Sequence, residues 1–194
     1  MTVFFRRIAQ TMSVLGGVVL SLVVAITVLS IIGRTGNSVM HSAFAQTNFA
    51  PLAQWLLDIG LGPIKGDFEL VEAMMAFAIF AFLPLAQMTG AHASVDIFTA
   101  WLPRRAQLVQ RILIEALFAV VLVVIALQLK EGMDSKLRSG QTTFILGYPL
   151  WWAYAASLCG AVVAAVVAVY MALVRVTEGV TGRILIADEM GADH

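Results

Sequence analysis

Four stretches of this chain are each long and apolar enough to cross a lipid bilayer, and no other feature constrains the fold as strongly. An α-helix rises about 1.5 Å per residue, so about 20 apolar residues cover a hydrocarbon core of roughly 30 Å. A soluble domain has no use for four such segments. The sequence therefore predicts an all-α integral membrane protein, a single membrane domain over residues 1–194, with spans at about 12–33, 70–88, 112–129 and 149–174.

The composition agrees with a surface that faces lipid or another membrane protein. Hydrophobic residues make up 60% of the chain and charged residues 12%, whereas ordinary globular proteins are about 25% charged. Twelve Lys and Arg residues balance twelve Asp and Glu residues, so bulk charge gives no attraction for nucleic acid. The single cysteine, Cys159, forms no disulfide within the chain and is expected to pack as a small apolar side chain.

The positions of the basic residues predict the orientation in the membrane. When the four spans are threaded, seven Lys and Arg residues fall on the side of the two termini and five on the opposite side. Paired arginines next to the membrane strengthen this bias. We therefore expect both termini in the cytoplasm, an outer loop over 34–69 and a cytoplasmic tail over 175–194.

The third span belongs to a longer predicted helix over residues 103–139. Pro103 suits the first turn of a helix, and Gly140 suits the position just after its end. At the outer side this helix is expected to stand out of the membrane by about two turns. Ion pairs along one face are expected between Lys130 and Asp134 and between Asp134 and Arg138.

Two segments between the spans predict short helices that lie in the membrane surface. Around Trp55 and around Trp101, apolar residues recur at helical spacing, and Gly or Pro residues bound each run. Tryptophan prefers the headgroup level of a bilayer, and Trp151 and Trp152 mark the outer end of the fourth span in the same way. The predicted fold is thus four transmembrane helices plus short interfacial helices.

Small residues recur at every fourth position in two of the spans. Such rows let helix backbones approach closely in lipid. Chance alone can produce one row, because alanine is common in membrane helices, but two rows favour close helix contacts within the chain or with a neighbour. The rows are Ala156, Gly160, Ala164, Ala168 and Ala172 in the fourth span, and Ser13, Gly17, Ser21 and Ala25 in the first.

Three acids open the second span. Asp67 and Glu69 lie in the first turn, where acids satisfy backbone amides and the positive end of the helix dipole. Glu72 lies one turn deeper and has two interpretations. It is either a structural or partner contact, or a membrane carboxylate that binds protons or cations.

The remaining polar candidates cluster toward the inner side. Gln87 is expected to form an interhelical hydrogen bond rather than a solute site, and Glu115 is expected to pair with Arg111. His92 and Asp96 stand four residues apart, as an orienting pair would. The chain has three histidines, none in the middle of a span, which excludes a bis-histidine haem. We expect no catalytic residue, cofactor or metal site in this chain.

Two segments resemble a known family: GDFELVEAMMAFAIFAFLPLAQMTGAHASVDIFTAWLP, residues 66–103, and FILGYPLWWAY, residues 144–154. The shared features are the glutamates that open the second span, the proline before Gln87, and His92 followed by Val95 and Asp96. The chain resembles the small membrane subunit, or small permease, of tripartite ATP-independent periplasmic (TRAP) transporters. The resemblance covers essentially the whole chain, through loose apolar motifs.

This resemblance implies a secondary transporter of a bacterial inner membrane that imports carboxylated organic acids with the sodium gradient. A soluble periplasmic substrate-binding protein would capture the solute, and a large membrane subunit would hold the sodium and substrate sites. The small subunit would be a scaffold embedded in membrane lipids beside the large one. The candidate structural or partner contacts are Glu72, Gln87, His92 and Asp96, and, toward the binding protein, Lys136 and Arg138 together with the first loop.

Two other classes of function remain. An autonomous small proton-coupled exporter or channel would use Glu72 as its coupling carboxylate and would lose all activity on Glu72→Gln. A membrane anchor of a redox enzyme is disfavoured by the missing histidine ligands.

Overall fold

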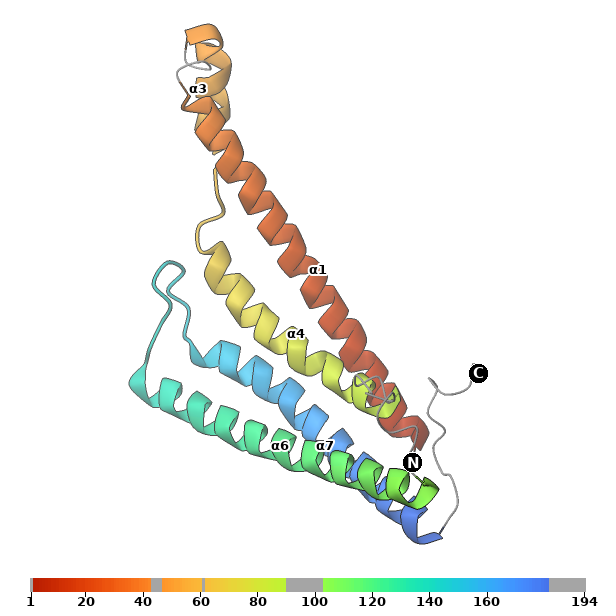
Figure 1. Ribbon diagram of the computed structural model, residues 1–194. Helices are drawn as coiled ribbons and strands as arrows, with labels where there is room; N and C mark the ends of the chain where they lie inside the picture. The colour runs from red at the N-terminus through yellow and green to blue at the C-terminus, as the bar shows by residue number, and fades with distance from the viewer. Residues whose placement is uncertain (1, 43–46, 61, 90–102, 182–194) are drawn as a thin grey trace.

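The computed structural model describes residues 2–42, 47–60, 62–89 and 103–181, which form helices joined by short connections (Figure 1). In chain order the helices are α1 (Thr2–Met40), α3 (Ala50–Asp58), α4 (Asp67–Thr89), α6 (Arg104–Ser139) and α7 (Trp151–Thr181). Outside these helices, the described residues form one isolated antiparallel bridge, between Thr142 and Pro149. All of these helices except α3 are long and apolar enough to cross a membrane, as the sequence predicts.

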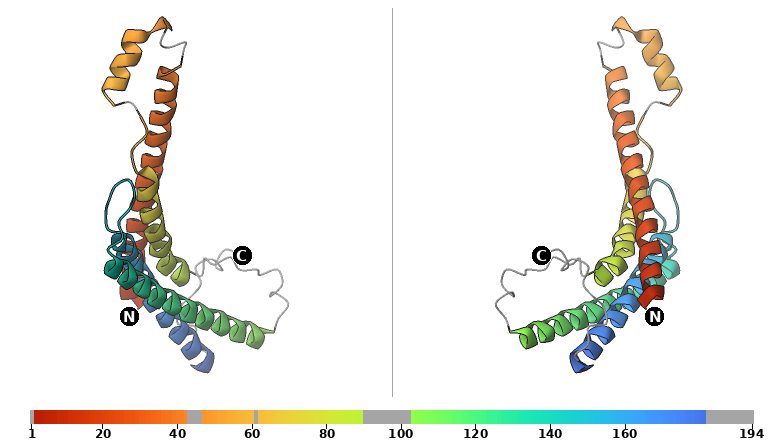
Figure 2. Two further views of the ribbon diagram at one scale, coloured as in Figure 1. Left: turned by 90° about the vertical axis from the view of Figure 1, so that its left-hand side faces the viewer. Right: turned by 90° about the vertical axis from the view of Figure 1, so that its right-hand side faces the viewer.

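The four long helices stand in a row in the order α1, α4, α7, α6. Helix α4 packs against α1 on one side and α7 on the other, and α6 packs against α7. Figure 2 shows that α6 and α7 run at an angle to α1 and α4. Phe5 stacks on Tyr170 with 4.1 Å between ring centroids, so the start of α1 and the last part of α7 share one end of the row. We call it the terminal end, and the opposite end, with residues 47–60, 62–66 and 140–150, the loop end.

The face of α1 toward α4 carries buried residues spaced seven apart. Seven residues make almost two helical turns, so Ala9, Gly16, Val23 and Ser30 share one face, and all four are buried. A Cβ atom added at Gly16 would lie 2.9 Å from the Cβ of Ala81. The absence of a side chain at Gly16 therefore sets how closely the two helices approach.

Helix α7 lies inside the row, and its small residues allow close packing against α4 on one side and α6 on the other. A Cβ atom added at Gly160 would lie 2.9 Å from the Cβ of Phe80 in α4. On the side of α6, Ala164 and Ala168 are buried in a cluster with Ala119, Leu122 and Ala165. The predicted close contacts of the fourth-span row are confirmed for Gly160, Ala164, Ala168 and Ala172, whereas Ala156 is exposed.

The row predicted in the first span is open at three of its four residues, Gly17, Ser21 and Ala25. A Cβ atom added at Gly17 would meet no atom within 4 Å, and Ser21 and Ala25 are exposed. Consecutive residues of a helix point about 100° apart, so α1 directs Gly16 toward α4 and Gly17 away from it. Because α1 stands at the edge of the row, no other long helix covers that second face.

Helix α1 is longer than the predicted span and projects beyond its neighbours at the loop end (Figure 1). The segment 34–69, expected as an outer loop, starts as helix because α1 continues through Gly33 to Met40. A Cβ atom at Gly33 would overlap the carbonyl of Gly62, so glycine is needed where the chain returns. The helix predicted around Trp55 is α3, and its position in the membrane surface stays a prediction.

Helix α6 follows the predicted range of 103–139 to within one residue. Gly140 ends it with φ 62°, a left-handed conformation that glycine adopts without strain. Helix α7 continues past residue 174 to Thr181, and thus extends into the expected tail. The short helix predicted around Trp101 lies outside the described residues.

Candidate functional site

The carboxylate of Glu69 fixes the 140–150 loop against the start of α4. One oxygen, Oε1, accepts a hydrogen bond from the backbone N–H of Ile145 at 2.8 Å, and Oε2 accepts one from Leu146 at 3.0 Å. The hydroxyl of Tyr148 donates to the backbone carbonyl of Glu69 at 2.9 Å. Glu69 was expected to satisfy amides, and it does so in a loop more than seventy residues away.

Close packing supports the same junction. Gly66, just before α4, is buried, and a Cβ atom added there would lie 2.5 Å from the side chain of Leu146. The ring of Tyr148 stacks on Trp152 with 6.5 Å between centroids. Burial and the negative charges of Glu69 and Glu72 raise the pKa of Tyr148, so its hydroxyl keeps the proton that it donates.

Asp67 joins α4 to α1 at the same end. The hydroxyl of Ser30 donates to Oδ2 of Asp67, and Nη2 of Arg34 lies 3.8 Å from that oxygen. Oδ1 accepts a hydrogen bond from the backbone N–H of Phe68 at 2.8 Å. The Arg34 side chain is 68% exposed, so this ion pair adds little stability, and the buried Ser30 hydroxyl is the specific contact.

Glu72 occupies an exposed position on α4, at helical spacing from the exposed residues Phe68, Met75 and Ile79. No group in the described parts of the chain forms a hydrogen bond or an ion pair with its carboxylate. The side chain therefore belongs to an outer face of the row and is not enclosed between helices. This position suits contact with a partner or with headgroups better than a place in a closed solute path.

Gln87 is the buried polar residue of α4, with 2% of its surface exposed. Its Nε2 atom donates a hydrogen bond to Oε2 of Glu115, and this contact joins α4 to α6. The interhelical hydrogen bond expected for Gln87 is thus present. The expected pairing of Glu115 with Arg111 stays a prediction. The bond to Gln87 adds a partner that lies 28 residues away, which no spacing rule indicates.

The end of α6 differs from the predicted ladder of charges. Neither ion pair expected along it, Lys130 with Asp134 or Asp134 with Arg138, forms in the described structure, so that expectation is wrong. The Nζ atom of Lys136 instead donates to Oε1 of Gln141 at 2.7 Å. Exposed charges gain little from pairing because water solvates them nearly as well.

Two candidate residues, His92 and Asp96, lie outside the described residues. In the parts of the chain that the structure does describe, no group of three or more His, Cys, Asp or Glu side chains could hold a metal ion.

Comparison with known proteins gives the family. Searches among curated proteins and among solved structures gave no match. The family described as "Tripartite ATP-independent periplasmic transporters, DctQ component" matches residues 59–178, more than half of the chain. The match includes both the Glu69 junction and the contact between Gln87 and Glu115. This family is a component of transporters, not an enzyme. The chain therefore belongs to the DctQ family, the small membrane component of TRAP transporters.

Proposed function

We propose that this chain is the scaffold subunit of a sodium-driven, binding-protein-dependent transporter that imports organic acids. A large membrane subunit would carry the sodium and substrate sites, and this chain would stand beside it. The family match carries this proposal. The arrangement of the helices in one row supports it, since a row offers broad faces to a neighbour.

The exposed faces are apolar on both edge helices. On α1, Val18 and Leu22 are 55% and 51% exposed, and on α6, Leu117 and Leu127 are 64% and 58% exposed. Exposing these apolar side chains to water is unfavourable, so lipid or another membrane protein must cover them. Such surfaces suit a subunit that widens a stationary body against which another subunit moves.

We further propose a bacterial inner membrane location with the terminal end in the cytoplasm. The loop end would then face the periplasm, where a soluble binding protein would arrive. The α1–α3 hairpin projects farthest at this end (Figure 1). Lys136 and Arg138 near the end of α6 are the candidate basic contacts for that protein.

The autonomous exporter is the weaker alternative. A coupling carboxylate must face a path that solute or protons can enter, and Glu72 is exposed on an outer face of the row. The exporter requires Glu72→Gln to abolish activity in a folded protein. The scaffold instead predicts that Glu72→Gln changes assembly or stability and leaves the turnover of assembled complexes intact.

The test is assembly with the large subunit. The tagged chain is co-expressed with a large TRAP membrane subunit encoded beside it and is purified in mild detergent. A stoichiometric complex that survives size-exclusion chromatography is expected. A stable oligomer of this chain alone, with the large subunit eluting separately, would overturn the scaffold proposal.

The contact with the binding protein has its own test. Lys136→Glu together with Arg138→Glu should weaken capture of the loaded binding protein by the complex in nanodiscs, and should weaken it most at low salt. Arg7→Glu at the terminal end is the matched charge reversal and should change nothing. Equal capture by the wild type, the double variant and the Arg7→Glu variant would show that the end of α6 does not contact the binding protein.

A further inference from the structure

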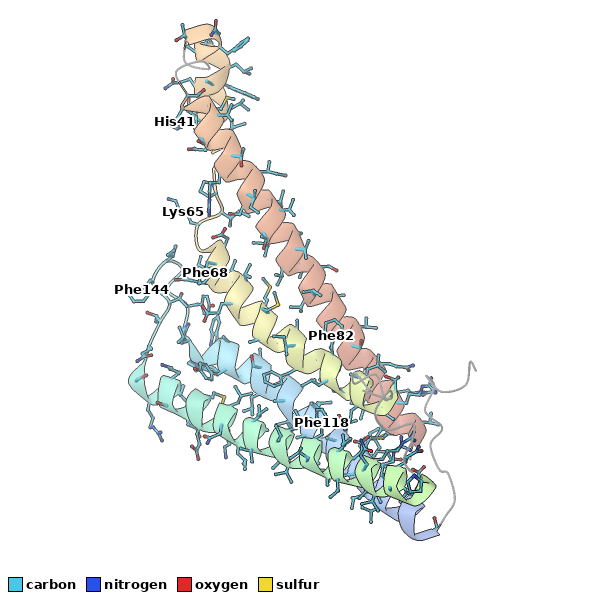
Figure 3. The ribbon with its side chains drawn as sticks, in the orientation of Figure 1. His41, Lys65, Phe68, Phe82, Phe118 and Phe144 are labelled. Carbon is cyan, nitrogen blue, oxygen red and sulfur yellow. The ribbon has the colours of Figure 1, made fainter. Side chains whose placement is uncertain are left out.

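A patch of exposed apolar side chains lies where the 140–150 loop meets the start of α4. Phe144 is fully exposed, and Ile145 and Leu146 are 62% and 42% exposed. Phe68, next to Glu69, is 74% exposed. Figure 3 shows Phe68 and Phe144 at the same end of the molecule. Contiguous exposed apolar surface marks a place that a partner or a membrane covers.

The loop holds this patch in a defined shape. Besides the two hydrogen bonds to Glu69, Thr143 N–H donates to the carbonyl of Tyr148 at 3.0 Å, and Leu150 N–H donates to that of Gln141 at 2.9 Å. Ordering a loop costs conformational entropy, and here hydrogen bonds within the chain offset that cost. The apolar tip is therefore ready to bind before any partner arrives.

The same hydrogen bonds lower the cost of moving the loop into lipid. Insertion into a bilayer is costly when backbone N–H groups lose their partners. The four donors at Thr143, Ile145, Leu146 and Leu150 are all bonded within the protein. Residues 140–150 also carry no charged side chain.

The surroundings of the loop match the boundary between headgroups and acyl chains. The patch continues through Tyr148 to Trp152, which is 55% exposed at the start of the membrane-spanning helix α7. Aromatic side chains with a polar tip prefer this level of a bilayer.

We propose that the 140–150 loop is a lipid anchor. It seats Phe144, Ile145 and Leu146 in the headgroup–acyl boundary of the leaflet at the loop end, and Glu69 holds it in the inserting shape. Because the loop joins α6 to α7, the anchor would fix how deeply these two helices sit in the membrane at this end. This inference rests on the loop itself and does not depend on the identity of the transported solute or of the large subunit.

The test places a fluorophore at the tip of the loop. In a Cys159→Ala background, which removes the one native and exposed cysteine, Phe144→Cys is labelled with the environment-sensitive NBD group. The full chain is reconstituted in nanodiscs made with lipids brominated at defined acyl positions. His41→Cys is the matched control, because His41 is exposed just after α1, at the projecting end of that helix.

The expected result at Phe144→Cys is a blue-shifted emission and quenching by shallow-brominated lipids that is severalfold stronger than at His41→Cys. Adding Glu69→Ala should reduce this quenching, because the loop loses the carboxylate that orders it. Quenching equal to the control, together with access of aqueous iodide, would overturn the proposal. Protection that arises only when the large subunit or the binding protein is added would overturn it as well, in favour of a protein contact.

Discussion

Two rows of small residues with the same four-residue interval have different environments in this protein. In α7, Gly160 meets Phe80, and Ala164 and Ala168 are buried. In α1, a Cβ atom at Gly17 would meet no other atom of the described residues within 4 Å, and Ser21 is exposed. The interval identifies a surface that another helix can approach closely, and the place of the helix in the row decides whether this chain provides that neighbour.

Burial along the spans separates α7 from the other long helices. In the most apolar window of each helix, 44% of the residues are buried in α7, 17% in α1, 17% in α4 and 11% in α6. All four helices are apolar enough to span a membrane, so apolarity does not distinguish α7 from the other three. In lipid there is little hydrophobic force between helices, and packing of small residues decides which faces meet.

The largest expected effect comes from filling the contact at the centre of the row. Gly160→Leu should lower the free energy of unfolding of the isolated chain by about 3 kcal/mol, because the new side chain meets Phe80. Gly17→Leu is the matched substitution on the open row and should change stability by less than about 0.5 kcal/mol. Unfolding by SDS titration, followed by circular dichroism, measures both. Equal losses of stability in the two variants would show that the row in α7 is packed no more tightly than the row in α1.

Two neighbouring glycines sharpen the comparison within a single helix. Gly16→Leu should lower stability by about 1–2 kcal/mol, because the side chain meets Ala81 of α4. Its neighbour Gly17 faces away, so Gly17→Leu again serves as the control. The same SDS titration measures both, and a Gly16→Leu protein as stable as the wild type would show that the close approach of α1 and α4 is not tight.

A smaller effect is expected from the polar contact that joins α4 to α6. Gln87→Leu removes the hydrogen bond to Glu115 and should lower stability by about 1 kcal/mol, in line with interhelical hydrogen bonds in membranes. Gln128→Leu, at an exposed position of α6, is the control for replacing an amide by an apolar group. A loss no greater than that of the control would mean that the contact only orients the helices.

The smallest effect is expected where α1 leaves the row at the loop end. Ser30→Ala removes the buried hydroxyl that donates to Asp67 and should lower stability by about 0.5–1 kcal/mol. Ser21→Ala is the control, because that hydroxyl donates to the carbonyl of Gly17 in its own helix and faces outward. The difference between the two melting temperatures in detergent checks the prediction, and no difference would contradict it.

The sequence predicts where the helices of this protein lie along the chain better than it predicts which helices pack against each other. Length and apolarity identify all four spans, and Gly140 marks the end of α6, because these signals are local. The order of the row is not local. Gly16 and Gly17 look alike in the sequence, and only the position of α4 separates them.

The polar contacts divide in the same way. Burial of Gln87 and its need for a partner follow from its place in an apolar span, but Glu115 as that partner depends on how two distant helices cross. The role of Glu69 in the 140–150 loop depends likewise on tertiary structure, since its first-turn position suggested amides of its own helix. The family resemblance, by contrast, was available from the sequence and agrees with the family match.

The central claim is that this chain supports transport without conducting the solute itself. The direct measurement is uptake of a radiolabelled organic acid into vesicles under an inward sodium gradient, with this chain alone and with the large subunit and the binding protein added. The account predicts no accumulation by the chain alone and sodium-dependent accumulation by the complete system. Accumulation by vesicles that contain only this chain would contradict it.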